Sequence, residues 1–288
     1  MRAALIGSTG QLATDLLPLL ARQYEVVALT HGELELTDYA AVTARLDREQ
    51  PTVVINTAAF HRVDDCEVAV ESAFSVNAFA PLTLARWCQR HGAVLVHFST
   101  DFVFGGDQPT PRGECDLAVP VSVYGASKLA GEHLVRQACA RHIVVRTCGL
   151  YGHAGSKGRG GNFVETMLRL GAGGKPLRVV ADQIVAPTAT ADLAPKILQV
   201  LATGRFGLYH ITNSGECSWY QFARAIFEFT GMRVELTPIS AAEYGAPARR
   251  PAYSVLRHDG LRALGLDDMP SWQDALRRYL RSRPQGAQ

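Results

Sequence analysis

Residues 2–20 read RAALIGSTGQLATDLLPLL and place a short apolar run, a glycine turn and a helix-like segment in succession. The apolar run predicts a buried strand, and the residues after the turn predict a helix. A strand that feeds a helix through such a turn brings backbone N–H groups and the positive helix end toward a pyrophosphate. Gly7 and Gly10 allow the tight turn, while Ala13 stands where a third glycine is common. The stretch predicts the first unit of a Rossmann-like fold.

Strand-like and helix-like segments alternate after this stretch, which predicts an α/β fold with a doubly wound parallel sheet. We expect strands within residues 25–30, 52–59, 93–104 and 143–152, and a loop followed by a long helix within 60–92. Pro18 should kink or shorten the first helix. The later chain mixes short strands and helices. We therefore expect a dinucleotide-binding Rossmann domain in residues 1–160. Residues 161–288 should form mainly a smaller α/β substrate-binding lobe, with some later elements packing back onto the first domain.

Composition narrows the classes of protein. The 288 residues are 47% hydrophobic and 19% charged, with a net charge of +2, and no basic stripe with interleaved aromatic residues suggests a nucleic-acid partner. No run of eighteen apolar residues is present and Met1 leads directly into the first strand, so we expect no membrane span and a cytoplasmic protein. The six cysteines include no C-x-x-C pair, which argues against a zinc site and a disulfide framework.

A second stretch carries candidate chemistry: FSTDFVFGG at residues 98–106 and VYGASKLAGE at 123–132. Tyr124 and Lys128 are four apart in a helix-favouring segment, so their side chains should project from one face. Thr100 ends a predicted strand, at the sheet edge where ligands bind in open α/β folds. A lysine ammonium lowers the pKa of a phenol from its usual value of about 10, which makes the tyrosine a usable acid. The three residues predict protonation of a carbonyl that receives a hydride, although an aromatic anchor and a solvated lysine would give the same spacing.

The end of the second predicted strand, Thr30-His31, has no acidic residue, whereas a protein strict for NAD usually has one there to bind the ribose 2′-hydroxyl. We therefore expect NADPH, with NADH as the alternative, and His31 is available to a 2′-phosphate. Asp38 either contacts the adenine or caps the next helix. Asn77, inside a predicted helix, either bends it, bonds a neighbouring strand, or braces the active site.

With these motifs placed, the chain resembles the extended short-chain dehydrogenase/reductase superfamily, and within it the dTDP-4-dehydrorhamnose reductase family. The resemblance covers nearly the whole chain. Its carriers are GSTGQLA at 7–13, LTD at 36–38, NTAAFHRVDDCE at 56–67, STDFVFGG at 99–106, YGASK at 124–128, NFVETMLRLG at 162–171, DQIVAPT at 182–188 and RRPAYSVL at 249–256.

The resemblance implies that a nicotinamide hydride reduces the C4 ketone of a nucleotide-linked deoxysugar, as in dTDP-L-rhamnose formation. Tyr124 would protonate the developing alkoxide, Thr100 would hydrogen-bond the same oxygen, and Lys128 would bind the nicotinamide ribose. The expected cofactor-binding residues are Gly7, Thr9, Gly10, Gln11, Leu12, Thr30, Asp38, Ala58, Ala59, Asn77, Tyr124 and Lys128. The expected substrate-binding residues are His61, Val63, Asp101, Phe102, Gly149, Asn162, Gln183, Arg249 and Arg250.

Two positions depart from the family pattern near the sugar. Gly149 stands where members often have a tryptophan, which suggests a roomier or differently shaped pocket, and Phe102 replaces a common tyrosine. Some members form dimers through a magnesium site of glutamates. Here the first matching position is Asp15 and the second is not found, so we predict no metal and either a monomer or a homodimer.

Other functions compete with this interpretation. A sugar-nucleotide 4,6-dehydratase needs an acid pair after the catalytic threonine, and Asp101 is followed by Phe102. An epimerase usually holds NAD tightly through an acid after the second strand. Another sugar-nucleotide ketoreductase, or a non-catalytic NADP-binding regulatory subunit of the methionine adenosyltransferase type, would share the fold. Arg249 and Arg250 are candidates for the substrate phosphates, although exposed arginine pairs are common.

Overall fold

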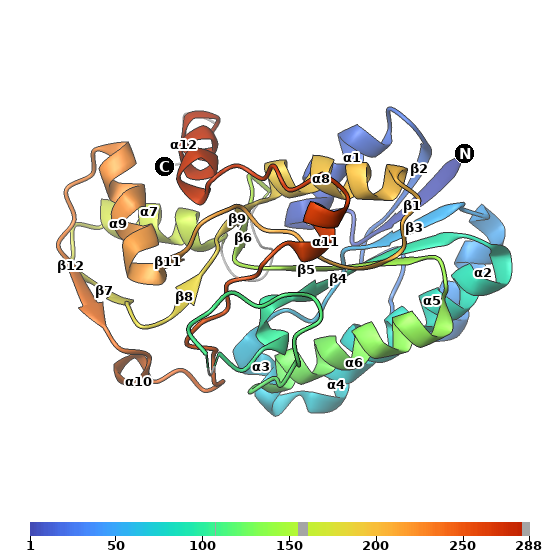
Figure 1. Cartoon of the computed structure of the whole chain (residues 1–288), viewed down its shortest axis with the longest axis horizontal. Helices are drawn as coiled ribbons and strands as arrows, with labels where there is room; N and C mark the ends of the chain where they lie inside the picture. The colour runs from blue at the N-terminus through green and yellow to red at the C-terminus, as the bar shows by residue number, and fades with distance from the viewer. Residues whose placement is uncertain (107, 155–160, 284–288) are drawn as a thin grey trace.

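A six-stranded parallel sheet forms the centre of the computed structural model, which describes residues 1–106, 108–154 and 161–283 (Figure 1). Its strand order is β10-β5-β4-β3-β1-β2. The strands are β1 (Arg2–Ile6), β2 (Glu25–Leu29), β3 (Val53–Asn56), β4 (Val94–Thr100), β5 (His142–Thr147) and β10 (Gly207–His210). Because β2 and β3 lie on opposite sides of β1, the chain reverses its direction of winding there, which is where such sheets bind ligands. The predicted α/β fold is confirmed.

Helices cover both faces of this sheet (Figure 1). One layer contains α1 (Gln11–Leu20) and α8 (Thr190–Ala202), and the other contains α2 (Tyr39–Glu49), α5 (Ala80–His91) and α6 (Val123–Ala138). Alternate strand residues face opposite layers, so Ile55 joins the core cluster with α1 and α8 while Val54 joins the cluster with α2 and α5. Burial on both faces explains why the central strands are almost entirely apolar.

A smaller lobe lies beside the sheet, at the left of Figure 1. Its helices are α7 (Phe163–Ala172), α9 (Trp219–Thr230), α10 (Ala241–Tyr244) and α12 (Trp272–Arg281). Its short strands pair as β12 (Leu236–Ile239) with β7 (Leu177–Val180), β11 (Cys217–Ser218) with β8 (Ile184–Val185), and β6 (Leu150–Tyr151) with β9 (Thr188–Ala189). Phe222 and Trp272 lie in the lobe's own core, whereas Ile197 of α8 and Tyr209 of β10 belong to the core of the main sheet. Residues 190–210 thus return to the first sheet.

The loop predicted at the start of residues 60–92 is present, but the long helix predicted after it is interrupted at Ala69. The structure contains α3 (Val63–Val68), α4 (Val70–Phe74), the π-helical segment η1 (Ser75–Phe79) and then α5. Ala69 separates α3 from α4 because its backbone leaves the helical region, at φ −117° and ψ 52°. The chain therefore changes direction before it reaches Asn77.

The prediction of a continuous strand within residues 143–152 is also wrong. β5 ends at Thr147, and β6 begins at Leu150 and pairs with β9 instead. Gly149 between them has φ 54°, in the left-handed region that a strand cannot contain. Pro18 lies in the last turn of α1, which ends at Leu20.

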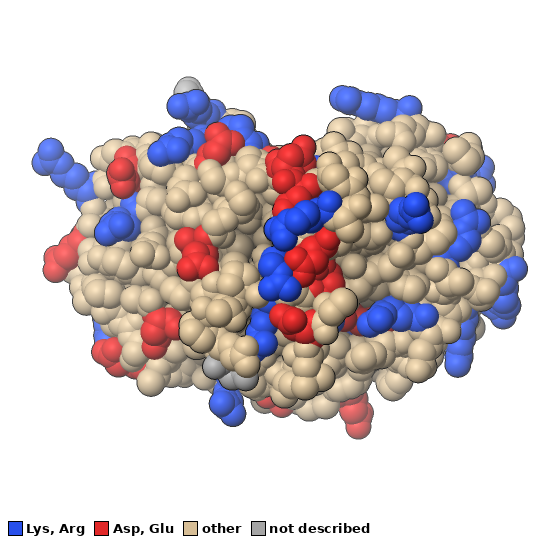
Figure 2. All heavy atoms as spheres, viewed as in Figure 1, with Lys and Arg blue, Asp and Glu red and all other residues tan. Residues whose placement is uncertain are grey.

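Charges on the face seen in Figure 2 are mostly scattered, apart from a central band where both signs alternate. Near α11 (Asp259–Ala263) the ion pairs include Arg257–Asp259 at 2.7 Å and Arg262–Asp267 at 3.3 Å. Among the residues that the structure describes, no helix has the length and apolar character needed to cross a bilayer.

Candidate active site

The turn between β1 and α1 is held against the ends of two strands. Gly7 has φ 75°, and a Cβ on it would come within 2.9 Å of the Ala58 nitrogen. The N–H groups of Gly7 and Ser8 donate to the Leu29 carbonyl at 2.9 and 3.1 Å, which fixes the turn on the end of β2. The first N–H groups of α1 have no partner within the helix. The turn can therefore present backbone donors to an anion.

A cavity of about 180 Å³ opens beside this turn. Its lining consists of Ile6, Gly7, His31, Leu34, Glu35, Leu36, Ala58, Ala59, Phe60 and Val76. The walls are mainly apolar, and the polar side chains are those of His31 and Glu35. The flat faces of an aromatic base such as adenine fit these mainly apolar walls. The glycine turn beside the cavity can then bind the attached phosphates.

The predicted cofactor residues at the start of α1 contribute through different groups. Thr9 is exposed on the turn, whereas the Leu12 side chain is buried in the core, which leaves only its backbone to face a ligand. The Gln11 side chain donates to the Leu150 carbonyl at 3.2 Å and accepts from the Gly152 N–H at 3.0 Å. The Gln11 side chain thus links α1 to β6. Only the backbone N–H of Gln11 is therefore left to bind a phosphate.

Thr30-His31 contains no acidic residue, as the sequence shows, but the turn after them brings the Glu33 carboxylate back to Thr30. The N–H and hydroxyl of Thr30 donate to the Glu33 carboxylate at 2.9 and 2.8 Å. These bonds lower the pKa of Glu33. The T-x-x-E spacing of a capping box could have signalled this contact. Asp38 is exposed and caps α2 by accepting from the Ala41 N–H at 2.9 Å.

Thr100 and Tyr124 come from different elements that meet. Thr100 is the last residue of β4, and its hydroxyl donates to Asp101 at 2.9 Å and accepts from the Phe102 N–H at 3.2 Å. The rings of Phe102 and Tyr124 make an edge contact with centroids 5.8 Å apart. A Cβ on Gly125 would come within 2.2 Å of the Phe102 carbonyl oxygen, so glycine lets α6 approach this segment. The start of α6 therefore lies against the residues that follow Thr100.

Lys128 follows Tyr124 by one helical turn and is buried, with 2% of its surface exposed. Burial lowers its pKa to about 8, and the negative charge of Glu132, one turn further along, opposes this shift. The ammonium remains the main form at neutral pH. A cation is therefore held on the face of α6 that carries Tyr124.

A buried ion pair behind Lys128 was not predicted. Glu132 accepts from the Nε and Nη2 atoms of Arg146 at 2.9 and 2.7 Å, and it also accepts from the Ser99 hydroxyl. Glu132, Arg146 and Ser99 are all at most 5% exposed. Because Ser99 directly precedes Thr100, the pair fixes α6 against β4 and β5. Polar residues within otherwise apolar strands were the available signal.

His210 extends this network. Its Nδ1 lies 3.1 and 3.0 Å from the carbonyl oxygens of Arg112 and Arg257, so Nδ1 must carry the proton. Its Nε2 then accepts from Arg146, which lies 3.3 Å away. Burial, reinforced by the Arg146 charge, lowers the pKa of His210 to about 3 and keeps the ring neutral.

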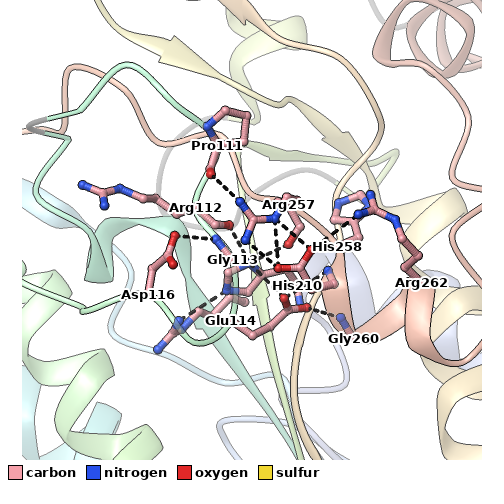
Figure 3. A network of polar contacts seen from close by, with 12 residues as sticks. Pro111, Arg112, Gly113, Glu114, Asp116, His210, Arg257, His258, Gly260 and Arg262 are labelled. Carbon is pink, nitrogen blue, oxygen red and sulfur yellow. Dashed lines mark hydrogen bonds and ion pairs between the residues drawn. The ribbon is translucent and has the colours of Figure 1, made fainter.

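Glu114 anchors the loop that joins Thr100 to Tyr124 (Figure 3). Its carboxylate accepts from the backbone N–H groups of His210, Asp259 and Gly260 at 2.9, 3.1 and 3.0 Å. These donors belong to β10 and α11. The loop is therefore tied to the last strand of the sheet and to the C-terminal part of the chain.

Asn77 braces the other side of α6. Its side chain accepts from the Phe60 N–H at 2.9 Å and donates to the Phe60 carbonyl and the Ser127 hydroxyl, each at 3.0 Å. Ser127 in turn donates to the Tyr124 carbonyl at 2.8 Å. The fully buried Asn77 thus joins the loop after β3 to the turn of α6 that carries Tyr124. Asn77 also lies in the π-helical segment η1, and its role in bracing the active site stays a prediction.

The predicted phosphate-binding arginines differ in their surroundings. Arg249 is exposed, whereas Arg250 donates from Nη2 to the Asp64 carboxylate at 2.8 Å. Asp64 lies beside Val63, whose side chain is buried, at the start of α3. His61 lies just before them, with Nδ1 3.4 Å from the Ala59 carbonyl. The ion pair brings the RRPAYSVL segment to α3, and phosphate binding by either arginine remains a prediction.

Other predicted substrate residues lie along the same segment. The buried Gln183 precedes Ile184, which donates to the Ala252 carbonyl at 2.8 Å and accepts from the Ser254 N–H at 3.0 Å. Burial raises the pKa of the nearby Asp101 carboxyl, and the Ser254 hydroxyl acts against this shift. The RRPAYSVL segment therefore passes beside Asp101, the residue after Thr100, and it pairs with the residue that follows Gln183.

An indole lies next to Gly149 although it comes from another element. A Cβ on Gly149 would lie 3.4 Å from Cη2 of Trp219, the first residue of α9, and 3.3 Å from Cα of Pro187. The space at Gly149 is therefore partly filled, which favours the differently shaped pocket over the roomier one among the two expectations. The linear sequence could not reveal this, because Trp219 is distant from Gly149 along the chain.

Asn162 has a structural role in the region of Gln11. Its Oδ1 caps α7 by accepting from the Glu165 N–H at 3.0 Å. Its Nδ2 donates to Gln11 at 3.2 Å, to the Gly152 carbonyl at 2.9 Å and to the Tyr279 hydroxyl at 3.2 Å. Only 5% of the residue is exposed. Contact of Asn162 with substrate stays a prediction.

Asp15, the position that matches the family's magnesium site, accepts a hydrogen bond from the Thr190 hydroxyl at 2.5 Å. Within the described ranges, the structure groups no three His, Cys, Asp or Glu side chains as a metal would require. The carboxylate of Asp15 thus joins α1 to α8.

Known proteins match this architecture along its length. The RmlD substrate binding domain family matches residues 1–283. The spore coat polysaccharide biosynthesis protein SpsK of Bacillus subtilis is 41% identical over 96% of this chain and 96% of its own. A probable dTDP-4,6-dihydroxy-2-methyloxan-3-one 4-ketoreductase of Streptomyces antibioticus is also 41% identical, over 96% of this chain and 94% of its own.

A solved structure gives the same result in three dimensions. The dTDP-4-dehydrorhamnose reductase of Bacillus anthracis, in complex with NADP, has a TM-score of 0.92 and 38% identity, and the match covers 97% of this chain and 98% of that chain. The resemblance drawn from the sequence motifs is thereby confirmed. The chain belongs to the RmlD substrate binding domain family and is a relative of the dTDP-4-dehydrorhamnose reductases.

Proposed function

We propose that this protein uses NADPH to reduce the C4 ketone of dTDP-4-dehydrorhamnose, which gives dTDP-L-rhamnose. The observation that carries the proposal is the packing of the residues on either side of Thr100 against the face of α6 that carries Tyr124 and the buried Lys128. Phe102 contacts the Tyr124 ring, and Ser99 donates to Glu132. Membership of the family and the NADP complex of the Bacillus anthracis relative support the cofactor and the reaction class.

The residues fit a dinucleotide. The cavity beside Gly7 has the apolar walls that an adenine needs, and Gly7 leaves room that a Cβ would fill. The first turn of α1 supplies backbone donors and a positive helix end for the pyrophosphate. Ala58 and Ala59, small residues that follow β3, line this cavity, and Ala58 lies against Gly7. The bound nicotinamide would supply the hydride.

The side chains would act on the oxygen of the ketone. Tyr124 donates its phenolic proton to that oxygen as negative charge develops on it, and Thr100 hydrogen-bonds the same atom. The Lys128 ammonium stabilises the phenolate that remains on Tyr124 after the transfer. Because these interactions strengthen as charge develops, they raise turnover more than they raise affinity.

The lobe formed mainly by residues 161–288 would bind the nucleotide sugar, together with His61, Val63, Asp101 and Phe102 at the edge of the sheet. Gln183 and the RRPAYSVL segment, with Arg249 and Arg250, would complete this site. The pairing of residues 252 and 254 with Ile184, and of Arg250 with Asp64, supports this assignment. We place the enzyme in the cytoplasm, where nucleotide sugars and NADPH are available. It would act as a monomer or a homodimer.

A second candidate is reduction of a different dTDP-linked 4-ketosugar. Phe102 and Gly149 depart from the family pattern, and the indole of Trp219 fills part of the space at Gly149. The Streptomyces antibioticus relative, named for a different ketosugar, is 41% identical. A change in pocket shape of this kind alters which sugar is preferred and leaves the proton donor unchanged.

The test follows the absorbance of NADPH in the presence of dTDP-4-dehydrorhamnose and a panel of other dTDP-4-ketosugars. Rapid oxidation with dTDP-4-dehydrorhamnose is the expected result. Preference for another ketosugar would keep the reaction and change the substrate. Oxidation with no member of the panel, despite tight NADPH binding, would contradict the proposal and favour a non-catalytic NADP-binding role.

A further inference from the structure

The Glu33 carboxylate is bound to two donors at the end of β2. A single oxygen, Oε2, accepts from the Thr30 N–H at 2.9 Å and from the Thr30 hydroxyl at 2.8 Å. The Thr30 carbonyl in turn accepts from the N–H groups of Glu33 and Leu34, each at 3.1 Å. The turn therefore folds the carboxylate back over the last residues of the strand.

These donors lie where an adenine ribose would rest. Leu29, the residue before Thr30, is bound to the glycine turn through the N–H groups of Gly7 and Ser8. His31, the residue after Thr30, lines the cavity that fits the adenine. In Rossmann folds the group at the end of the second strand meets the 2′-position of that ribose. A 2′-phosphate would thus arrive at the N–H and hydroxyl of Thr30.

We propose that Glu33 occupies the donors for the 2′-phosphate and so lowers the preference of this protein for NADPH over NADH. The inference rests on the dinucleotide site of the proposed function. An N–H and a hydroxyl on one residue are typical donors to phosphate, and the carboxylate takes both of them in the free protein. NADPH must displace Glu33 or bind beside its charge, whereas the 2′-hydroxyl of NADH meets no such repulsion.

Neighbouring charges do not cancel the effect of Glu33. Glu35 adds a second carboxylate at the cavity, with His31 3.6 Å from it. Arg45 attracts Glu33, but its own hydrogen bond, of 2.9 Å, goes to Glu49. The surroundings of Thr30 are therefore net acidic, which disfavours a phosphate dianion and leaves a hydroxyl unaffected.

A purely local role for Glu33 predicts a different outcome. The same pair of hydrogen bonds joins Ser240 to Glu243, where an N–H and a hydroxyl donate to Oε2 at 2.9 Å each and form a capping box in the lobe. If Glu33 only stabilises its turn, Glu33→Gln and Glu243→Gln should behave alike, since a neutral glutamine can keep both turns in place. If Glu33 blocks the Thr30 donors, the neutral glutamine accepts from them more weakly and yields them to a phosphate more easily.

The experiment measures the dissociation constants of NADPH and NADH for the wild-type protein, Glu33→Gln and Glu243→Gln by cofactor fluorescence. Adenosine 2′,5′-bisphosphate and adenosine 5′-monophosphate serve as fragment probes. We expect Glu33→Gln to tighten NADPH and the bisphosphate by about fivefold, the size of one exposed charge interaction, with NADH and the monophosphate unchanged. The gain should shrink at high salt, and Glu243→Gln should change neither cofactor. Thr30→Val should act in the opposite direction and weaken NADPH more than NADH.

The inference would be overturned if the ratio of the NADPH and NADH dissociation constants were the same in the wild-type protein and Glu33→Gln. Ketone reduction by the wild-type protein would then still support the proposed function. The inference would also be overturned if Thr30→Val changed the dissociation constant of neither cofactor. Failure of the wild-type protein to bind either cofactor would contradict both.

Discussion

Glu132 and Arg146 form a two-point ion pair inside the protein, with nitrogen–oxygen distances of 2.9 and 2.7 Å and side chains at most 3% exposed. Glu132 lies two helical turns after Tyr124 and one turn after Lys128, on the same face of α6. Arg146 lies in β5, and Ser99 of β4 also bonds to Glu132. The pair therefore sets the position of the α6 face relative to the strand that ends in Thr100.

Glu132→Gln should destabilise the protein because it leaves the Arg146 charge buried without a counterion. We expect the free energy of unfolding to fall by about 3 kcal/mol in urea denaturation. Adding Arg146→Met removes the unpaired charge and should recover part of the loss. The exposed Arg178–Glu243 pair, at 3.3 Å, is the control, and Glu243→Gln should leave stability nearly unchanged. A double variant no more stable than Glu132→Gln would count against this explanation.

The alkaline limb of the pH profile should report Lys128. Its pKa is lowered to about 8 by burial, so the ammonium is present below that pH and is lost above it. We expect kcat/KM for ketone reduction to fall as the pH rises through about 8, because the tyrosine then loses its cationic neighbour. In Lys128→Arg the guanidinium stays charged, so the limb should move to higher pH even if the rate is lower. An unchanged limb in that variant would assign it to another group.

Asn77→Ala should loosen the turn of α6 that carries Tyr124. The substitution leaves the Phe60 N–H and carbonyl without their side-chain partner, at a cost of about 2 to 4 kcal/mol of unfolding free energy. The Phe60 amide should also exchange with deuterium faster. Ser127→Ala is the control, because it keeps both bonds between Asn77 and Phe60. Equal destabilisation by the two substitutions would show that Phe60 is not the important partner.

Gly149→Ala should lower the stability of the protein by more than the backbone strain of an alanine at positive φ. Gly149 has φ 54° and close neighbours, whereas Gly245 has φ 66° and a Cβ added there would meet nothing within 4 Å. Gly245→Ala thus measures the backbone strain, at about 1 kcal/mol. Gly149→Ala should lower the free energy of unfolding by more than this amount, because Pro187 and Trp219 would have to shift. Gly149→Trp should not fold stably. Equal thermal stability of the two alanine variants would show that the space at Gly149 is open.

Local patterns were sufficient to predict the fold and the placement of the main motifs. The glycine turn at Gly7 and the alternating strands and helices gave the parallel sheet, and the spacing of Tyr124 and Lys128 placed both on α6. These features depend on neighbours in sequence, so the sequence shows them. The catalytic and binding roles of the predicted residues remain predictions.

Features that depend on contacts between distant segments were missed. The break at Ala69 and the left-handed Gly149 reflect packing, and no local signal separates them from a helix and a strand. The Glu132–Arg146 pair and the indole of Trp219 beside Gly149 join residues that are far apart along the chain. Glu33 lies three residues beyond Thr30, and only the fold of its turn brings the carboxylate back to the end of β2.

The turnover of Tyr124→Phe tests the central claim most directly. The variant keeps the aromatic ring, which makes an edge contact with Phe102, and removes only the hydroxyl that donates the proton. NADPH oxidation with dTDP-4-dehydrorhamnose should fall by a factor of about 10² or more in kcat, while the dissociation constant of NADPH stays the same. Turnover within about threefold of the wild-type value would contradict the assignment of Tyr124 as the proton donor.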